Sequence, residues 1–551
     1  IASEPTNSKM VKAASIGLSI TGWLIERGDR EKALGGIVTF FSRPFMLWSM
    51  EKAIKRIANF FQVEDGIRDG LTRAIKLGRS DYSLSYDILG ESSRTAEQAE
   101  IYYAQYLDAI QAMVAVQRED RQRVGNASLS VKLTALHPKV ELSKLDQLRD
   151  ELLPKLVSLI KLCQEHDIPI TFDAEEASRL EIYLALVSDL ICMPEFASFH
   201  HIGFVVQAYQ KRAYCLVEEI VALAKKTKKR IPVRLVKGAY WDAEIKHAQE
   251  LGLEDYPVFT VKEHTDISYI ACAELLLKNA ELVYPQFATH NAHTAATIEA
   301  MTQGKDLDFE FQKLHGMGGT LHNVLVKKGH KVRIYAPVGK HESLLAYLMR
   351  RIIENGANTS FVNIAMDENI KEEELVAHPW EGAPHSGKGV VVLPDDIFSV
   401  GGQNGVQNRE EGANMGRKNS RGLDMGYMEN LAKIKKAMDD YKSKTYVVAP
   451  IVGGETIIAG KRQHTYSPGN VVDKIASLYV IQESVHNAVD YAIEGGVEWG
   501  RLPVAKRVQI LKKVAETLER NKYELYMLLM REGGKVIEDC IAEVREAIDF
   551  A

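Results

Sequence analysis

The sequence is poor in cysteine, and its cysteines follow no recognisable pattern. The 551 residues contain only five, without a CxxC motif: Cys163, Cys192, Cys215, Cys272 and Cys540. Scattered thiols of this kind indicate neither a disulfide framework nor a cysteine-based metal site. They are typical of a reducing compartment, so we expect a cytoplasmic location.

Long apolar runs and a strong net charge are also missing. No uninterrupted apolar run reaches the ~20 residues that a membrane-spanning helix needs. The formal net charge of −5 gives no support for nucleic-acid binding by the bulk of the chain. The length calls for two or more domains. The chain begins with Ile1 and ends at Ala551 within a helical pattern, so we expect both ends to lie inside a longer protein.

The middle of the chain alternates between short apolar runs and amphipathic helices, whereas residues 1–80 predict a helical arm. Such alternation predicts a parallel sheet, and about eight units over ~240 residues favour an α/β fold of the (βα)8 TIM-barrel type. A doubly wound sheet is the alternative, but no GxGxxG follows a first strand. The predicted strands are Leu129–Leu133, Ile168–Phe172, Gly203–Gln207, Val233–Val236, Gln286–Thr289, Phe309–Leu314, Lys331–Tyr335 and an eighth near Thr359–Val362. Predicted helices between them include Pro154–Glu165, Glu176–Ser188, Ala213–Lys226 and Ile267–Lys278.

The last third of the chain predicts a separate, partial α/β domain. Residues 366–445 are acidic and glycine-rich, which indicates a linker and domain entry, and 446–551 follow as the partial domain. A hairpin is expected to turn at Gly453 and Gly454. Helices are predicted at Ser484–Glu494, Pro503–Glu519, Lys522–Arg531 and Lys535–Ala551. We expect this domain to bury poorly the apolar helix face formed by Val504, Val508, Leu511 and Leu518.

Polar residues stand near the ends of the predicted strands, where a barrel carries its catalytic groups. Lys132 and Asp173 are predicted to end the first two barrel strands, although a purely structural buried pair is an alternative. The full set is Lys132, Asp173, Gln207, Arg234, Lys237, His290, Asn291, His315 and Tyr335.

A predicted helix from Ser343 to Asn355 carries a second candidate group. Tyr347, Arg350, Arg351 and Glu354 fall at i, i+3, i+4 and i+7 and so share one face. Two adjacent guanidiniums beside a phenol are suited to gripping a carboxylate, because each guanidinium offers a rigid fork of donors. The alternative for such a pair is a solvated, charged helix face.

Two other classes of function have to be weighed. His290 and His293, three positions apart, could join Asp173 in a metal site, which would suit a metal-dependent lyase or hydrolase on the same barrel. No HExxH motif or cysteine cluster supports that reading. A non-enzymatic scaffold would leave the polar strand ends and the Arg350–Arg351 pair without an explanation.

Several long segments resemble the proline dehydrogenase domain of the bifunctional proline utilization A family. They are YDILGE (86–91), SLSVKLTALHP (128–138), TFDAEEASRLE (171–181), GFVVQAYQKR (203–212), RLVKGAYWDAEIK (234–246), PQFATHNAHT (285–294), FEFQKLHGMG (309–318) and RIYAPVG through RRIIENGANTSFVN. Residues 81–365 would then form the flavin barrel. A weaker resemblance to the start of an aldehyde dehydrogenase domain follows, in SPGN (467–470) and residues 503–519 and 532–550.

The resemblance implies an FAD-dependent oxidation of L-proline to Δ1-pyrroline-5-carboxylate by hydride transfer to the flavin, the first step of proline catabolism to glutamate. It implies a quinone as electron acceptor and peripheral association with the inner membrane face, and it leaves oligomer formation open. The family's NAD-dependent semialdehyde oxidation is not expected here, because no cysteine stands in the expected context of a nucleophile. The family's DNA-binding module has no counterpart in these residues.

The resemblance also implies a role for individual residues. Arg350 and Arg351 would clamp the proline carboxylate, Tyr347 and Tyr335 would bound the ring, and Lys132 and Glu354 would orient the charged arms. Asp173 would lie beside the ring, Leu314 would wall the pocket, and Glu91 would partner an active-site arginine. Arg234 would lie by the reactive flavin nitrogen, and His293 would be structural. The implied FAD contacts are Gln207, Arg234, Val236, Lys237, Gly238, Ala239, Tyr240, Trp241, Thr289 and His290.

Overall fold

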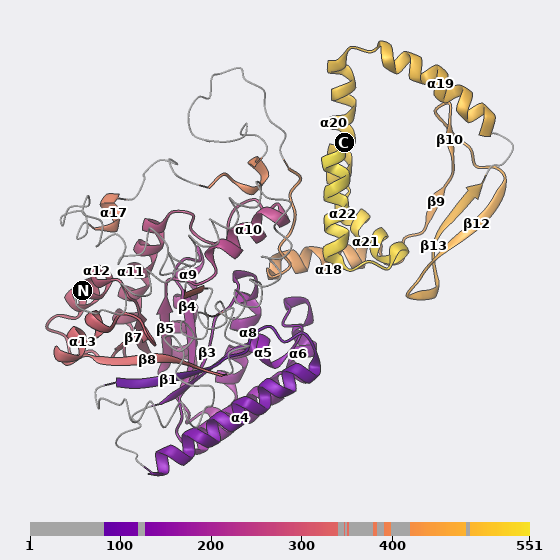
Figure 1. Cartoon of the computed structure of the whole chain (residues 1–551). Helices are drawn as coiled ribbons and strands as arrows, with labels where there is room; N and C mark the ends of the chain where they lie inside the picture. The colour runs from indigo at the N-terminus through magenta and orange to yellow at the C-terminus, as the bar shows by residue number, and fades with distance from the viewer. Residues whose placement is uncertain are drawn as a thin grey trace, which may run out of the picture.

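Eight parallel strands form a closed barrel in the order β1 to β8 (Figure 1). The structure is a computed structural model that describes residues 82–119, 127–339, 347, 350–351, 378–382, 391–397, 419–480 and 485–551. The predicted helical arm therefore lies outside the described residues, and the predicted barrel is confirmed. Its strands are β1 (Tyr82–Ile88), β2 (Ser128–Val131), β3 (Ile170–Phe172), β4 (Ile202–Gln207), β5 (Ile231–Val236), β6 (Val283–Ala288), β7 (Glu310–Leu314) and β8 (Lys331–Val338).

The barrel closes between its first and last strands. β1 pairs with β8 along its whole length, from Tyr82 opposite Val332 to Ile88 opposite Val338. The eighth strand was predicted near residues 359–362, which lie outside the described residues, and β1 completes the barrel of eight. Lys132 and Asp173 consequently follow the second and third strands, not the first two. Polar Ser85 and Asp87 interrupt the apolar pattern of β1, which is why the strand was missed.

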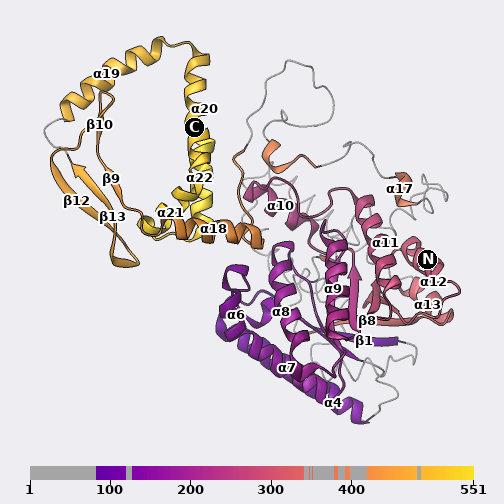
Figure 2. The ribbon, with the colours of Figure 1, turned by 180° about the vertical axis from the view of Figure 1, so that it is seen from behind.

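Helices cover the outside of the barrel (Figures 1 and 2). Side chains such as Phe172, Leu186 and Val206 are completely buried between the two layers, as expected for strands covered on their outer face. Predicted helix ends agree with the structure within five residues. α8 starts later than predicted because a 3-10 turn occupies residues 177–179, and α11 starts earlier, at Lys262. The barrel helices are α4 (Ala96–Glu119), α5 (Leu133–Leu136), α6 (Leu145–Glu151), α7 (Leu153–Glu165), α8 (Leu180–Cys192), α9 (Ala213–Thr227), α10 (Trp241–Leu251), α11 (Lys262–Lys278), α12 (Ala292–Thr302) and α13 (Gly319–Lys327).

The C-terminal part combines two small sheets with five helices. The hairpin predicted at Gly453 and Gly454 is confirmed, and both glycines have the positive φ that its turn requires. Two strands, β12 and β13, were not predicted, and α18 lies in the stretch predicted as linker. The elements are α18 (Met428–Tyr441), β9 (Tyr446–Val448), β10 (Ile451–Val452), β11 (Glu455–Thr456), β12 (Lys461–Ser467), β13 (Asn470–Val480), α19 (Val485–Arg501), α20 (Val504–Arg520), α21 (Lys522–Gly533) and α22 (Ile537–Phe550).

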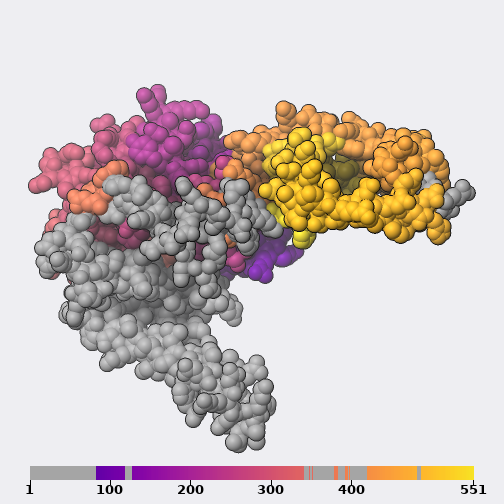
Figure 3. Space-filling model, turned by 90° about the horizontal axis from the view of Figure 1, so that it is seen from above, coloured from indigo at the N-terminus to yellow at the C-terminus, as the bar shows by residue number. Residues whose placement is uncertain are grey.

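This part lies beside the barrel and is in contact with it (Figure 3). The Gly422 amide donates to the Gly252 carbonyl at 3.0 Å, and Arg545 Nη1 donates to the Glu250 carbonyl at 2.9 Å. As predicted, α20 leaves its apolar face uncovered, with Val504 65% exposed. None of the helices among the described residues is both long and apolar enough to cross a lipid bilayer.

Candidate active site

Four of the predicted residues meet at the carboxyl ends of the barrel strands. The buried Asp173 carboxylate, just past β3, accepts a hydrogen bond from Arg234 Nη1 on β5 at 2.8 Å. Its second oxygen accepts from the Tyr335 hydroxyl on β8 at 2.7 Å and from Lys132 Nζ, just past β2, at 3.2 Å. A single carboxylate thus takes three donors from three different strands, and charge-assisted bonds of this kind fix geometry strongly.

Neutral side chains hold the Arg234 guanidinium from the other side. Its Nε donates to Gln312 Oε1 at 2.8 Å, and its Nη2 donates to Ser85 Oγ and Ser130 Oγ at 3.2 and 3.1 Å. The guanidinium carbon also lies 5.1 Å from the centre of the Tyr335 ring. Since every one of these partners is buried or nearly so, Arg234 is held in one orientation.

Sequence reasoning missed a second carboxylate at this site, that of Asp87 on β1. It forms an ion pair with Lys132 Nζ, and Asp87 is 1% exposed. Burial raises the pKa of Asp87, and Lys132 opposes that rise. Burial would lower the pKa of Lys132, but Asp87, Tyr335 and Asp173 outweigh it and raise that pKa well above its usual value. Asp87 and Asp173 thus favour the ammonium form of Lys132.

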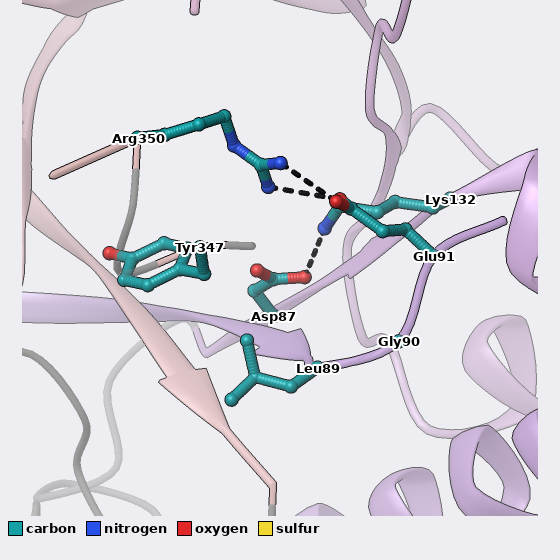
Figure 4. A pocket seen from close by; sticks show the side chains of 7 residues that line it. All are labelled: Asp87, Leu89, Gly90, Glu91, Lys132, Tyr347 and Arg350. Atoms are coloured by element: carbon teal, nitrogen blue, oxygen red, sulfur yellow. Dashed lines mark hydrogen bonds and ion pairs between the residues drawn. The ribbon is translucent and has the colours of Figure 1, made fainter. Parts of the chain in front are cut away.

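A second ion pair stands above this network. Arg350 donates two hydrogen bonds to Glu91, from Nη1 at 2.7 Å and from Nη2 at 2.9 Å (Figure 4). Burial would raise the pKa of Glu91, but these bonds outweigh it and lower that pKa. Glu91, expected to partner an active-site arginine, thus pairs with Arg350. A small pocket lies between the two networks, lined by Asp87, Leu89, Gly90, Glu91, Lys132, Tyr347 and Arg350.

The predicted helix around residue 350 is described at three positions, all helical: Tyr347, Arg350 and Arg351. Tyr347 and Arg350 line the pocket together, and the Arg351 guanidinium carbon lies 5.3 Å from the Tyr347 ring centre. Tyr347 is 5% and Arg351 8% exposed. The alternative of a solvated face is therefore wrong for these residues. Glu354 lies outside the described residues.

The residues predicted to contact FAD lie on neighbouring strand ends. Gln207 ends β4, Val236 ends β5, and Lys237 to Trp241 form the turn into α10. Gln207 Nε2 donates to the Glu175 carbonyl at 3.1 Å, and Lys237 forms an ion pair with Asp266. Thr289 and His290 follow β6, where His290 Nε2 accepts from the Leu314 amide at 3.1 Å. The predicted cofactor residues thus share one rim of the barrel.

Gly238 and Arg234 show whether the residues at this rim fit a bound flavin. Gly238 has a φ of +135°, and a Cβ there would lie 2.4 Å from the Tyr209 ring. Only glycine suits such a position, because the Tyr209 ring occupies the place where a Cβ would lie. The fixed Arg234 guanidinium nearby can stabilise an anionic ring system. The residues present therefore fit the group.

The metal-site alternative needs the Asp173 carboxylate and the His290 and His293 rings as ligands of one ion. The Asp173 carboxylate is engaged by Lys132, Arg234 and Tyr335, while His290 accepts from a backbone amide. The His293 ring lies 6.4 Å from that of His378. Within the described part of the chain, no group of three or more His, Cys, Asp or Glu side chains could hold a metal ion.

Comparison with known families agrees with this geometry. The family model "Proline dehydrogenase" matches residues 71–364, more than half of the chain. The chain belongs to the proline dehydrogenase family. The model "Aldehyde dehydrogenase family" matches residues 459–551, in the part predicted as a partial domain. The proline dehydrogenase match spans the whole barrel and the residues of the pocket.

Curated relatives extend the likeness along the chain. The bifunctional protein PutA of Escherichia coli is 38% identical over 571 residues, covering 98% of this chain and 41% of the relative. PutA of Rhizobium meliloti is 37% identical, covering 99% of this chain and 44% of the relative. The chain thus spans less than half the length of these relatives. Proline dehydrogenase 1 of Bacillus subtilis is 29% identical, covering 58% of this chain and 96% of the relative.

Solved structures give the same result. Proline utilization A from Bdellovibrio bacteriovorus, inactivated by N-propargylglycine, matches with a TM-score of 0.82 at 25% identity. That match covers 94% of this chain and 54% of the other. A proline utilization A variant from Bradyrhizobium japonicum matches with a TM-score of 0.74 at 35% identity, covering 94% of this chain and 48% of the other.

Proposed function

We propose that this chain oxidises L-proline to Δ1-pyrroline-5-carboxylate, with FAD as the hydride acceptor. The observation that carries the proposal is the pocket between two charged networks. Lys132, Arg350 and Tyr347 all line it. A small ring that bears a carboxylate matches this combination of cationic and aromatic groups.

Binding and orientation are the main contributions of the chain's own residues. Arg350 and Lys132 attract the substrate carboxylate, and Arg351, held against Tyr347, adds a second guanidinium. Tyr335 and Tyr347 confine the ring, and the buried Asp173 fixes Tyr335 through the hydrogen bond from its hydroxyl. Holding the ring in one orientation lowers the barrier mainly through positioning.

FAD, when bound, supplies the acceptor for the hydride that leaves the ring carbon next to nitrogen. In this proposal Gln207, Lys237 and His290 hold it at the rim, and the buried Arg234 guanidinium faces it from inside the barrel. The electron acceptor beyond it is a quinone, reached by peripheral association of a cytoplasmic protein with the membrane. The scattered cysteines support the cytoplasmic location, and the resemblance to the proline utilization A family implies the quinone and the membrane association.

One spectrum tests the proposal. The purified chain should show flavin absorbance, and L-proline should bleach it in the absence of oxygen. Arg234→Met should lose bound FAD, because the guanidinium that faces it is removed. Arg230→Met is the matched control: this half-buried arginine just before β5 pairs with Asp308 and should leave the flavin in place. A colourless protein that gains no activity with added FAD would refute the proposal.

A further inference from the structure

The Asp87 carboxylate lies at the pocket, next to the Lys132 ammonium. Its side chain comes from the carboxyl end of β1 and lines the pocket together with Lys132, Glu91, Tyr347 and Arg350 (Figure 4). Among the described residues, its carboxylate is the acceptor nearest to the Lys132 ammonium. The two other acceptors, Asp173 and the Tyr335 hydroxyl, are 3.2 and 3.4 Å away.

The balance of buried charge makes Asp87 necessary to Lys132. Asp173 already accepts from Arg234 at 2.8 Å and from Tyr335 at 2.7 Å. The cluster therefore contains two cations, Lys132 and Arg234, against two carboxylates. Without Asp87, one buried positive charge would have no counter-ion, and removing one partner of a buried pair is strongly unfavourable.

We propose that Asp87 is the positioning residue for Lys132: its carboxylate holds the ammonium at the lining of the pocket as a cation that faces the anionic group of the substrate. Asp87 acts through Lys132, since its own negative charge would repel a carboxylate. The inference rests on the proposed function, in which the proline carboxylate enters this pocket.

The other groups around Lys132 come from several elements. Asp173 and Tyr335 face its ammonium from β3 and β8, and the Tyr106 hydroxyl on α4 accepts from its backbone amide at 3.2 Å. Glu91 and Arg350 pair with one another across the pocket, and Arg234 lies on the far side of Asp173. None of these supplies a carboxylate that can replace Asp87, because Glu91 is engaged by Arg350 and Asp173 by Arg234.

Competitive acetylation of lysines between pH 7 and 10, read by peptide mass spectrometry, tests the link directly. Only the neutral amine reacts, and burial slows Lys132 equally in all variants. The change in its rate between variants, taken relative to the exposed Lys278, therefore reports the change in the neutral fraction of Lys132. Asp87→Asn keeps the shape of the side chain but removes its charge. The pKa of Lys132 should then fall, and each unit of fall raises the relative rate about tenfold. The KM for proline should rise about tenfold or more, with a smaller change in kcat.

Two variants separate this role from a general effect of lost charge. Glu310→Gln removes another buried carboxylate of the barrel, the partner of Arg333, and should leave Lys132 labelling at the parent rate. Asp87→Glu keeps the charge and should retain slow labelling of Lys132. If Asp87→Asn fails to fold, the labelling rate of Asp87→Glu still tests whether the charge at position 87 sets the pKa of Lys132. Parent-like labelling in Asp87→Asn, fast labelling in Asp87→Glu, or an equal rise in Glu310→Gln would overturn the inference. A parent that does not oxidise proline would refute the proposed function, while labelling would still test the Asp87–Lys132 link.

Discussion

Replacing Arg350 should weaken proline binding by an amount that the structure allows us to bracket. Arg350→Met removes one charge-assisted interaction with the substrate carboxylate, worth ~1.5–3 kcal/mol, or roughly 10- to 150-fold in affinity. It also leaves the Glu91 carboxylate without the two hydrogen bonds that it accepts at 2.7 and 2.9 Å. That unpaired negative charge repels the incoming carboxylate, so we expect the upper part of the range.

The double variant Arg350→Met, Glu91→Gln isolates this repulsion. Removing the charge of Glu91 should recover part of the lost affinity, whereas two independent losses would add. Binding is measured by titration with a non-oxidisable carboxylate analogue of proline, and KM for proline by steady-state kinetics. Flavin content should stay at the parent level in both variants.

Arg212→Met provides the matched control. Arg212 pairs with Glu181 at 2.8 Å, with side-chain exposures of 28% and 26%, against 19% and 24% for Arg350 and Glu91. The loss of a comparable pair away from the pocket should leave proline binding unchanged. If Arg350→Met binds proline within about twofold of the parent, or if Arg212→Met weakens binding as much, the assignment of Arg350 to the substrate is wrong.

Three further predictions concern stability and cofactor retention. Arg333→Met should lower the free energy of unfolding in urea by ~3–5 kcal/mol, because it leaves the buried Glu310 carboxylate without a cation; a loss below ~1 kcal/mol would contradict this. Burial lowers the pKa of His322 to about 4 from 6.5, so the unfolded state binds the proton more readily than the folded state. As the pH falls from 6.5 to 4, the free energy of unfolding of the parent should therefore fall by roughly 3 kcal/mol more than that of His322→Gln. Gly238→Ala should lower the Tm and release FAD, because its Cβ would lie 2.4 Å from the Tyr209 ring; parent-like flavin absorbance after gel filtration would count against that.

The sequence contained enough to predict the barrel and the charged residues of its active face. Seven of the eight strands were found because they are apolar runs of the right length, and Lys132, Asp173, Arg234 and Tyr335 stood out as polar residues near their ends. The first strand was missed because its inward side chains are polar. Those same side chains, Ser85 and Asp87, hydrogen-bond to Arg234 and Lys132.

Contacts between residues that only the folded chain brings together could not be predicted from the sequence. Gln312 looks like any polar residue within a strand, and only the closed sheet brings its amide to Arg234. The same applies to α18, whose Leu431, Ile434 and Ala437 are buried although the segment lies in a stretch rich in charge. Such residues are identified by what they pack against, and a single sequence does not contain that information.

The seam between β1 and β8 has a consequence for how the molecule assembles. The Leu84 carbonyl accepts from Arg333 across 249 residues of chain, and the strand that carries Asp87 pairs along its whole length with the last strand. During synthesis the first strand must therefore wait for nearly the whole barrel to leave the ribosome before its outer edge is covered. Contacts of such long range slow folding, and an uncovered edge invites pairing with other chains. Completion of the pocket and protection of the nascent chain from aggregation thus depend on the same late event.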